Sequence, residues 1–176
     1  MARREDLGSW LEGTPAGEGP DGGSGRGRLR LPAAGAGSRA GVGRRLVALA
    51  VDWVLSMLVS GAFFPEPGAV VPRVLAGDPV ATLLVFGVST LVLVMTLGHT
   101  VGHRVMGLQV VRVRDLPGAD PEDARAFAPP SSWPPPGPVA AALRTALLCL
   151  VIPPAIWDGD GRGMHDAAAG TVIVRR

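Results

Sequence analysis

The sequence contains no lysine, no tyrosine and only one cysteine, Cys149. A single cysteine excludes an intrachain disulfide and a metal site built from several cysteines. Cys149 stands in an apolar run, so we expect an inert packing residue rather than a nucleophile. Charged residues make up only 18 % of the chain and the net charge is +2, with no basic patch interleaved with aromatic residues. We therefore expect no nucleic-acid partner.

Hydrophobic residues, by contrast, make up 47 % of the chain, and the mean hydropathy is positive at +0.31. This composition favours an integral membrane protein whose first partner is the lipid bilayer. Three apolar runs cover residues 46–64, 80–97 and 139–157. The first two come close to the roughly 20 residues that a membrane-spanning helix needs.

The third run, residues 139–157, contains Arg144 near its start and is broken by Pro153 and Pro154. The uninterrupted part gives about 21 Å of helix, which is shorter than a bilayer core of about 30 Å. This segment either spans, with Trp157 in the far interface, or is re-entrant, tilted or interfacial. We favour two full spans, because the C-terminus then returns to the side on which the chain began.

One acidic residue, Asp52, lies inside the first run, about 9 Å beyond its start at helical rise. A carboxylate there is costly, so it must face protein or water, find a partner or be protonated. Arg45 lies two helical turns before Asp52, and Ser56 and Ser60 continue the same face. This one-sided stripe predicts packing against another helix. Asp52 is either a buried structural anchor or a residue that handles protons or cations, and we favour the anchor.

Hydroxyl side chains mark one face of the second run as well, where Thr82, Ser89 and Thr96 recur at a regular spacing. Two helices with such stripes, joined by a short loop, predict an antiparallel hairpin with hydroxyls at its interface.

Two short segments rich in β-branched residues, 108–113 and 171–175, predict a pair of strands. If they pair, the C-terminus lies on the same side of the membrane as residues 108–113. The fold class that follows is mainly α and integral to the membrane. It consists of a helical hairpin, a third apolar helix and a short two-stranded β element at the cytoplasmic face.

Residues 1–43 are rich in glycine, proline, alanine and arginine and are expected to form a disordered cytoplasmic tail. Residues 44–176 then form the membrane domain, with the proline-rich residues 115–138 as a linker. Arg104 and the arginines that follow make the loop after the second run basic. By the positive-inside rule, the N-terminus and this loop are cytoplasmic. We therefore expect a multi-pass protein of the cell membrane.

Three blocks of sequence occur in order. Arg45 stands seven residues before Asp52, a glycine-rich block runs from Gly98 to Val111, and the C-terminal block from Arg162 to Val174 contains an Arg-Gly-x-His-Asp motif. Together, over about residues 38–176, these blocks resemble the RDD family of small bacterial membrane proteins.

The resemblance implies which charged residues matter. Arg45, Asp52 and Asp166 would be the arginine and the two aspartates after which the family is named. The motif residues Arg104, Arg162 and His165 are secondary candidates. The resemblance implies a multi-pass membrane protein, and transport, as ion or proton exchange, enters only as a hypothesis.

No catalytic residue and no cofactor are expected, because no serine stands in a nucleophile-elbow context. His99 and His103 have the spacing of two metal ligands on one helix face, but Gly98 and Gly102 argue against a helix there. We therefore expect His99, His103 and His165 to be solvated interfacial residues, and we expect no metal site and no enzyme.

Asp166 is interpreted as structural, gathering with Arg45 and Arg162 at the cytoplasmic rim. Two functions remain. The first is a structural or accessory membrane module whose partners, a second copy or another membrane protein, confer function. The second is a subunit of an oligomeric ion or proton-coupled transporter that uses Asp52.

Overall fold

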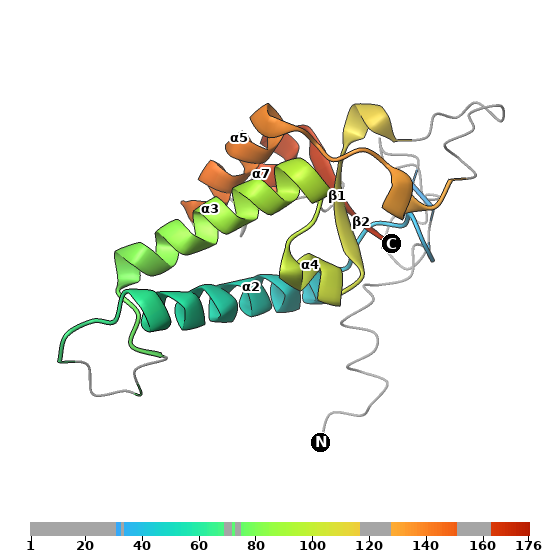
Figure 1. Cartoon of the computed structure of the whole chain (residues 1–176). Helices are drawn as coiled ribbons and strands as arrows, with labels where there is room; N and C mark the ends of the chain where they lie inside the picture. The colour runs from blue at the N-terminus through green and yellow to red at the C-terminus, as the bar shows by residue number, and fades with distance from the viewer. Residues whose placement is uncertain (1–30, 33, 69–71, 73–74, 117–127, 151–162) are drawn as a thin grey trace, which may run out of the picture.

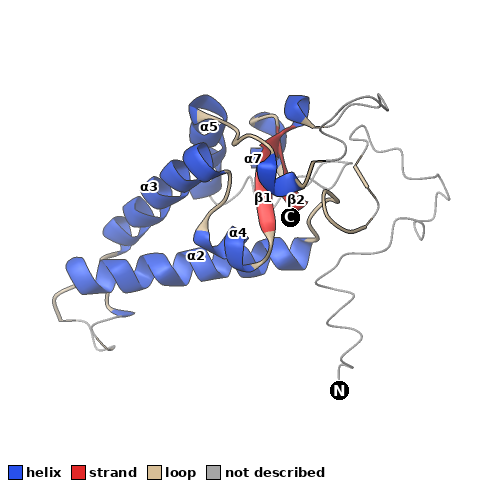
Figure 2. Cartoon of the chain, turned by 45° about the vertical axis from the view of Figure 1, so that its right-hand side comes forward, coloured by secondary structure: helices blue, strands red, loops and turns tan. Residues whose placement is uncertain are grey.

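The computed structural model describes residues 31–32, 34–68, 72, 75–116, 128–150 and 163–176 of the chain. Two long helices, α2 (Val42–Phe63) and α3 (Pro79–Leu97), form a hairpin and lie closest near the loop that joins them. They diverge toward the opposite end, where the shorter helices and a two-stranded sheet gather (Figure 1, Figure 2). We call this the sheet end of the molecule.

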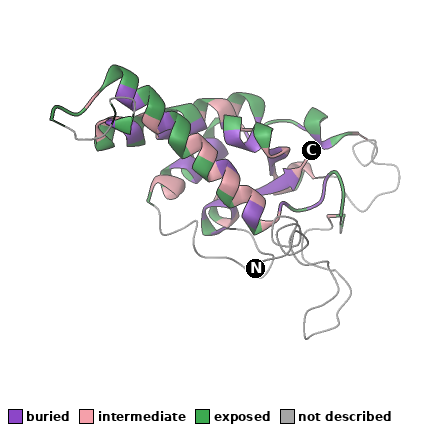
Figure 3. Cartoon of the chain, turned by 90° about the horizontal axis from the view of Figure 1, so that it is seen from below, coloured by how far each residue is buried: buried purple, intermediate pink, exposed green. Residues whose placement is uncertain are grey.

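Both long helices are long and apolar enough to cross a membrane. Only 22 % of the most apolar window of each helix is buried inside the protein, so most of their apolar surface faces outward. Figure 3 shows exposed residues along the helices and buried residues in the strands. Exposed side chains such as Trp53, Leu58 and Leu84 form the kind of large apolar surface that marks a membrane contact. The runs predicted at residues 46–64 and 80–97 are thus confirmed as membrane-capable helices.

Hydrogen bonds around Asp78 close the hairpin at its loop end. The Asp78 carboxylate accepts from the Ala81 N–H at 2.7 Å and caps α3, whose first residue is a proline that has no N–H to satisfy. Ser60, near the end of α2, donates to the Asp78 carbonyl at 3.2 Å, and Thr82 donates to the same carbonyl at 2.9 Å. Polar side chains therefore fix the turn between two apolar helices.

The hydroxyl stripe predicted on α3 is wrong in part. Thr82 is buried, but Ser89 and Thr96 are exposed, and each donates to a carbonyl of its own helix. The buried residues of α3 are Thr82, Phe86, Thr90 and Val94. The buried residues do not stay on one face of the helix, because α3 packs against both α2 and α5 (Pro138–Cys149). On α2, Ser56 and Ser60 are buried as predicted.

The two predicted strands pair as expected. β1 (Leu108–Arg112) and β2 (Thr171–Arg175) are antiparallel, with Leu108 opposite Arg175 and Arg112 opposite Thr171. The first four residues of each strand are buried, so both faces of the sheet are covered. One apolar cluster includes Ala48, Val94, Leu108, Val110, Ala141 and Ile173, and the other consists of Val111, Trp133, Val172 and Val174.

Part of the predicted N-terminal tail is ordered. The Ala40 N–H donates to the Ile173 carbonyl at 3.0 Å, and the Arg175 N–H donates to the Ser38 carbonyl at 2.9 Å. These residues lie beside β2, and α2 begins at Val42. The folded domain therefore begins before residue 44, and residues 1–30 of the predicted tail lie outside the described part.

The predicted proline-rich linker also contributes to the core. Within residues 115–138, Trp133 is buried in the second apolar cluster, and its carbonyl accepts from Gln109 Nε2 at 3.1 Å. Two short 3-10 helices, η2 (Val113–Asp115) and η4 (Pro130–Ser132), lie in this region. Residues 117–127 lie outside the described part.

Three further helices complete the sheet end: α4 (Val101–Val105), α5 and α7 (Met164–Ala168). The third apolar run was predicted over residues 139–157, as a spanning, re-entrant or interfacial segment. Its described part, α5, has 12 residues and is shorter than the two membrane-capable helices. Residues 151–162 lie outside the described part.

Candidate functional site

The N-terminal end of α4 holds Asp52. The Asp52 Oδ1 accepts a hydrogen bond from the Gly102 N–H at 2.7 Å, and its Oδ2 accepts one from the Thr100 hydroxyl. Thr100 is the N-cap of α4, where its Oγ1 accepts from the His103 N–H at 3.1 Å. Asp52 therefore joins α2 to the segment that connects α3 with the sheet.

Gly102 makes this contact possible. A Cβ at this position would lie 2.0 Å from the Ala48 carbonyl oxygen and 2.8 Å from Asp52 Oδ2. Only glycine lets the backbone of α4 approach α2 this closely. The prediction that Gly98 and Gly102 prevent a helix here is wrong for residues 101–105. Gly98 instead ends α3 with a positive φ of 74°, and Gly102 lies inside α4.

A second buried contact joins Arg144 on α5 to Asp166 on α7. The Arg144 Nε lies 2.7 Å from Asp166 Oδ1, and the side chains are 2 % and 0 % exposed. Thr171 of β2 donates to the same Oδ1 at 2.9 Å, and His165 Nε2 lies 3.5 Å from Asp166 Oδ2. One carboxylate therefore connects three elements, α5, α7 and β2.

Burial and neighbouring charges set the protonation of two groups in the cluster. Burial raises the pKa of the Asp166 carboxyl, but the charges of Arg144, His165 and Arg45 outweigh burial and hold it at about 2. Burial lowers the pKa of His103 from 6.5 to about 3, and the charge of Arg144 lowers it too. At neutral pH, Asp166 is therefore ionised and His103 is a neutral imidazole.

A cavity of about 60 Å³ lies between the two contacts. Its polar lining residues are Arg45, Asp52, Thr90, Thr100, His103, Arg144 and His165. Apolar side chains of α2, α3, α5 and β2 complete the wall, among them Leu46, Phe86, Leu148 and Ile173. The arrangement is a small, partly charged chamber at the sheet end of the hairpin.

A family model, described as RDD family, matches residues 39–170. The chain belongs to the RDD family. This match confirms the resemblance drawn from the three sequence blocks, which covered about residues 38–176. Comparisons with curated proteins and with solved structures found no match.

The structure brings the three expected RDD residues to one region. Arg45 and Asp52 line the same cavity, as their shared helix face predicts. Asp166 lies next to Arg144, a lining residue, and the positive charge of Arg45 contributes to its lowered pKa. Asp166 was expected to gather with Arg45 and Arg162, but its ion pair is with Arg144, and Arg162 lies outside the described part.

Sequence reasoning missed Arg144 as a member of the RDD cluster. Its position inside an apolar run was visible, and a cation there needs an anionic partner for the reason given for Asp52. The same argument identifies Arg144 as a candidate site residue alongside Asp52 and Asp166. It does not predict that Asp166 is the partner of Arg144, because this pairing depends on how α7 packs against α5.

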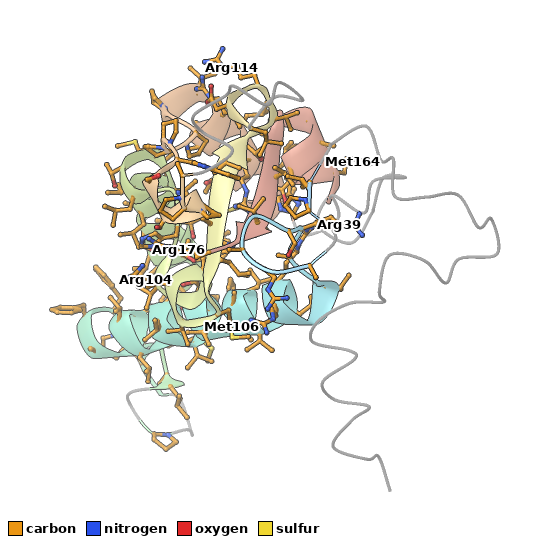
Figure 4. The ribbon with its side chains drawn as sticks, turned by 90° about the vertical axis from the view of Figure 1, so that its right-hand side faces the viewer. Arg39, Arg104, Met106, Arg114, Met164 and Arg176 are labelled. Carbon is orange, nitrogen blue, oxygen red and sulfur yellow. The ribbon has the colours of Figure 1, made fainter. Side chains whose placement is uncertain are left out.

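The secondary candidates separate into buried and exposed groups. His165 and His103 are each 7 % exposed, so the expectation of solvated interfacial histidines is wrong for both. Arg104 is exposed, and Figure 4 shows it near Arg176 at the sheet end. Within the described residues, no group of three or more His, Cys, Asp or Glu side chains is placed to hold a metal ion.

Proposed function

We propose that this RDD protein is a multi-pass protein of the cell membrane that acts as a structural or accessory module, not as an enzyme. One observation carries the proposal: Asp52 and Asp166 each tie a separate part of the sheet end to another element. Asp52 binds α4 to α2, and Asp166 binds α7 to α5 and β2. Carboxylates used in this way specify how a polar cap docks beneath apolar helices.

The distribution of arginine supports a cytoplasmic sheet end. The four arginines labelled in Figure 4, at positions 39, 104, 114 and 176, all lie at that end. The opposite loop, residues 64–78, contains two acidic residues, Glu66 and Asp78, and a single arginine, Arg73. Under the positive-inside rule, this asymmetry orients the N-terminus and the sheet toward the cytoplasm and the loop outward.

The outward faces of α2 and α3 support the lipid bilayer as the first partner, because most of their apolar surface is not buried in the protein. A module of this kind needs a second copy or another membrane protein to act on. The hairpin is small, and its faces leave room for such a helix partner.

The second candidate function is a subunit of an oligomeric transporter, in which Asp52 exchanges a proton or a cation. One contact favours it: Thr100 Oγ1 lies 2.6 Å from His103 Nδ1 and also donates to Asp52. The Thr100 hydroxyl lies between Asp52 Oδ2 and His103 Nδ1, and Nδ1 also accepts from the Thr100 N–H at 3.4 Å. This hydroxyl is therefore placed to connect Asp52 with His103, as a path for protons between the two side chains requires.

The substitution Asp52→Asn separates the two functions, because it removes the charge and keeps the shape. The matched control is Asp78→Asn, which changes a carboxylate at the far end of the hairpin and retains an N-cap side chain. Membrane level and thermal unfolding are measured for both, together with cation-driven proton flux in proteoliposomes.

A module predicts normal membrane level, a modest loss of stability for Asp52→Asn, and no flux attributable to the wild-type protein. Flux in the wild type that disappears in Asp52→Asn at normal membrane level, while Asp78→Asn retains it, would favour the transporter instead.

A further inference from the structure

The cavity between Asp52 and Arg144 has room for a ligand. Its volume of about 60 Å³ exceeds the share of one water molecule, which is about 30 Å³ in the liquid. A purely apolar cavity of this size would stay dry, but this one is lined by charged and hydroxyl side chains. The occupant is therefore water or one small ion.

The charged residues of the cavity wall indicate whether a cation or an anion fits the cavity. Arg45 and Arg144 line the cavity with two guanidinium groups, and Asp52 is the one acidic residue among the described lining residues, while Asp166 is paired with Arg144. Both Asp52 oxygens already accept hydrogen bonds from α4, through Gly102 and Thr100. A cation placed here would meet two fixed positive charges and a carboxylate that is already engaged.

The guanidinium of Arg144 supplies an unsatisfied donor. Its Nε is used by Asp166, whereas its Nη1 is buried with no hydrogen-bond partner among the described residues. Arg144 is 2 % exposed, so bulk water does not satisfy this group. Burying an N–H without an acceptor is costly, and the cost is higher for a charged group. Because Arg144 lines the cavity, an acceptor bound there is placed to satisfy this donor.

We infer that the cavity binds a small monovalent inorganic anion, of which chloride is the simplest, through Arg144 Nη1 and the positive charge of Arg45. The anion supplies the acceptor that Arg144 Nη1 lacks, next to the second guanidinium, that of Arg45. Leu46, Phe86 and Leu148 line the apolar side of the cavity. This site does not depend on which of the two proposed functions holds, because neither assigns a ligand to Arg144.

The first test uses the full-length protein, purified in detergent in sodium gluconate without chloride. Chloride replaces gluconate at constant sodium and constant ionic strength, while Tm and the chloride NMR linewidth are followed. We expect Tm to rise with the logarithm of the chloride concentration once that concentration exceeds the Kd of the site. The chloride linewidth should be larger with the protein present than without it. Bromide should reproduce the rise in Tm.

A second arm holds chloride constant and replaces sodium with N-methylglucamine. No change in Tm is expected. If chloride has no effect in the first arm, or if sodium and not chloride raises Tm, the cavity holds water or a cation and the inference is wrong.

Variants locate the effect. Arg45→Gln removes one lining charge and leaves the pair between Arg144 and Asp166 in place, and we expect the apparent chloride affinity to fall by about tenfold or more. The double variant Arg144→Gln with Asp166→Asn removes both charges of the buried pair together, and the chloride dependence of Tm should disappear. The control Arg114→Gln changes an exposed side chain and should bind chloride as the wild type does. Unchanged chloride dependence in Arg45→Gln and in the double variant would place the anion elsewhere and overturn the assignment.

Discussion

Arg144 and Asp166 form an ion pair in which the Nε and Oδ1 atoms are 2.7 Å apart and neither side chain is more than 2 % exposed. The pair joins a helix of the third apolar run to a short helix near the C-terminus. An ion pair at this depth adds little net stability compared with apolar residues, but removing one partner leaves the other charge buried and uncompensated.

The substitution Arg144→Gln should lower the free energy of unfolding by about 3–5 kcal/mol, because the Asp166 carboxylate loses its counter-charge. The measurement is denaturant or thermal unfolding of the purified protein in detergent. The double variant with Asp166→Asn should recover part of this loss, since it buries neither charge. A single variant as stable as the wild type would show that Asp166 has another counter-charge of equal strength.

Gly102→Ala should strongly destabilise the protein, because the added Cβ would lie 2.0 Å from the Ala48 carbonyl oxygen. A backbone oxygen cannot move aside as a flexible side chain can. The matched control is Gly87→Ala on α3, whose Cβ would meet only Cys149 Sγ at 3.5 Å, an ordinary contact. Unfolding temperature and membrane level should fall for the first and hold for the second. Equal tolerance of both would mean that α4 does not approach α2 as closely as described.

Thr171→Val should cost about 1.5–3 kcal/mol of stability, since it removes a buried hydroxyl that donates to the ionised Asp166 Oδ1 at 2.9 Å. Thr96→Val makes the same chemical change at an exposed position of α3 and should leave stability nearly unchanged. Unfolding curves of the two variants give the comparison directly. A loss as large for Thr96→Val as for Thr171→Val would argue against a specific role for the hydroxyl bound to Asp166.

His103 should make the protein sensitive to mild acid. Its folded-state pKa of about 3 lies below the ordinary 6.5, so the unfolded chain binds the proton more readily. Stability should be complete above pH 6.5 and should fall by up to about 1.4 kcal/mol per pH unit as the pH drops toward 3. Asp166 adds to this only below its ordinary pKa of 3.8, down to about 2.

The check is the pH dependence of unfolding in the wild type and in His103→Asn. The variant keeps a polar group near Thr100 and removes the titrating imidazole, so its stability should be flatter between pH 6.5 and pH 4. Parallel curves for the two proteins would show that His103 is accessible to protons in the folded state.

Much of the fold followed from local pattern. The two long apolar runs predicted α2 and α3, and the β-branched segments predicted β1 and β2 together with their pairing. The predictions that were wrong concern features that depend on tertiary packing. The line of buried residues on α3 drifts because the helix leaves α2 to contact α5, and no spacing within residues 80–97 encodes that. Trp133 belongs to the core although it stands in a proline-rich segment, since it packs against Val111, Val172 and Val174 of the two strands.

In the candidate site too, the sequence identifies individual residues, whereas their partners depend on tertiary packing. The cost of an ionised side chain in an apolar run drew attention to Asp52, and the motif at the C-terminus drew attention to Asp166. The partner of each is remote in sequence: Asp52 meets Thr100 and Gly102, and Asp166 meets Arg144. The low helix propensity of glycine predicts no helix at Gly102. In the structure, Gly102 instead allows α4 to approach α2 closely, and this contact depends on the tertiary structure.

The side of the membrane on which each end of the hairpin lies can be measured by cysteine labelling. In a Cys149→Ser background, single cysteines replace Glu66 in the loop, Arg114 after β1 and Arg176 at the C-terminus. A membrane-impermeant maleimide is then applied to intact and to permeabilised cells. Labelling of position 66 in intact cells, with positions 114 and 176 labelled only after permeabilisation, is the predicted result. Labelling of position 176 from outside, or of all three positions from the same side, would contradict a membrane hairpin with a cytoplasmic sheet end.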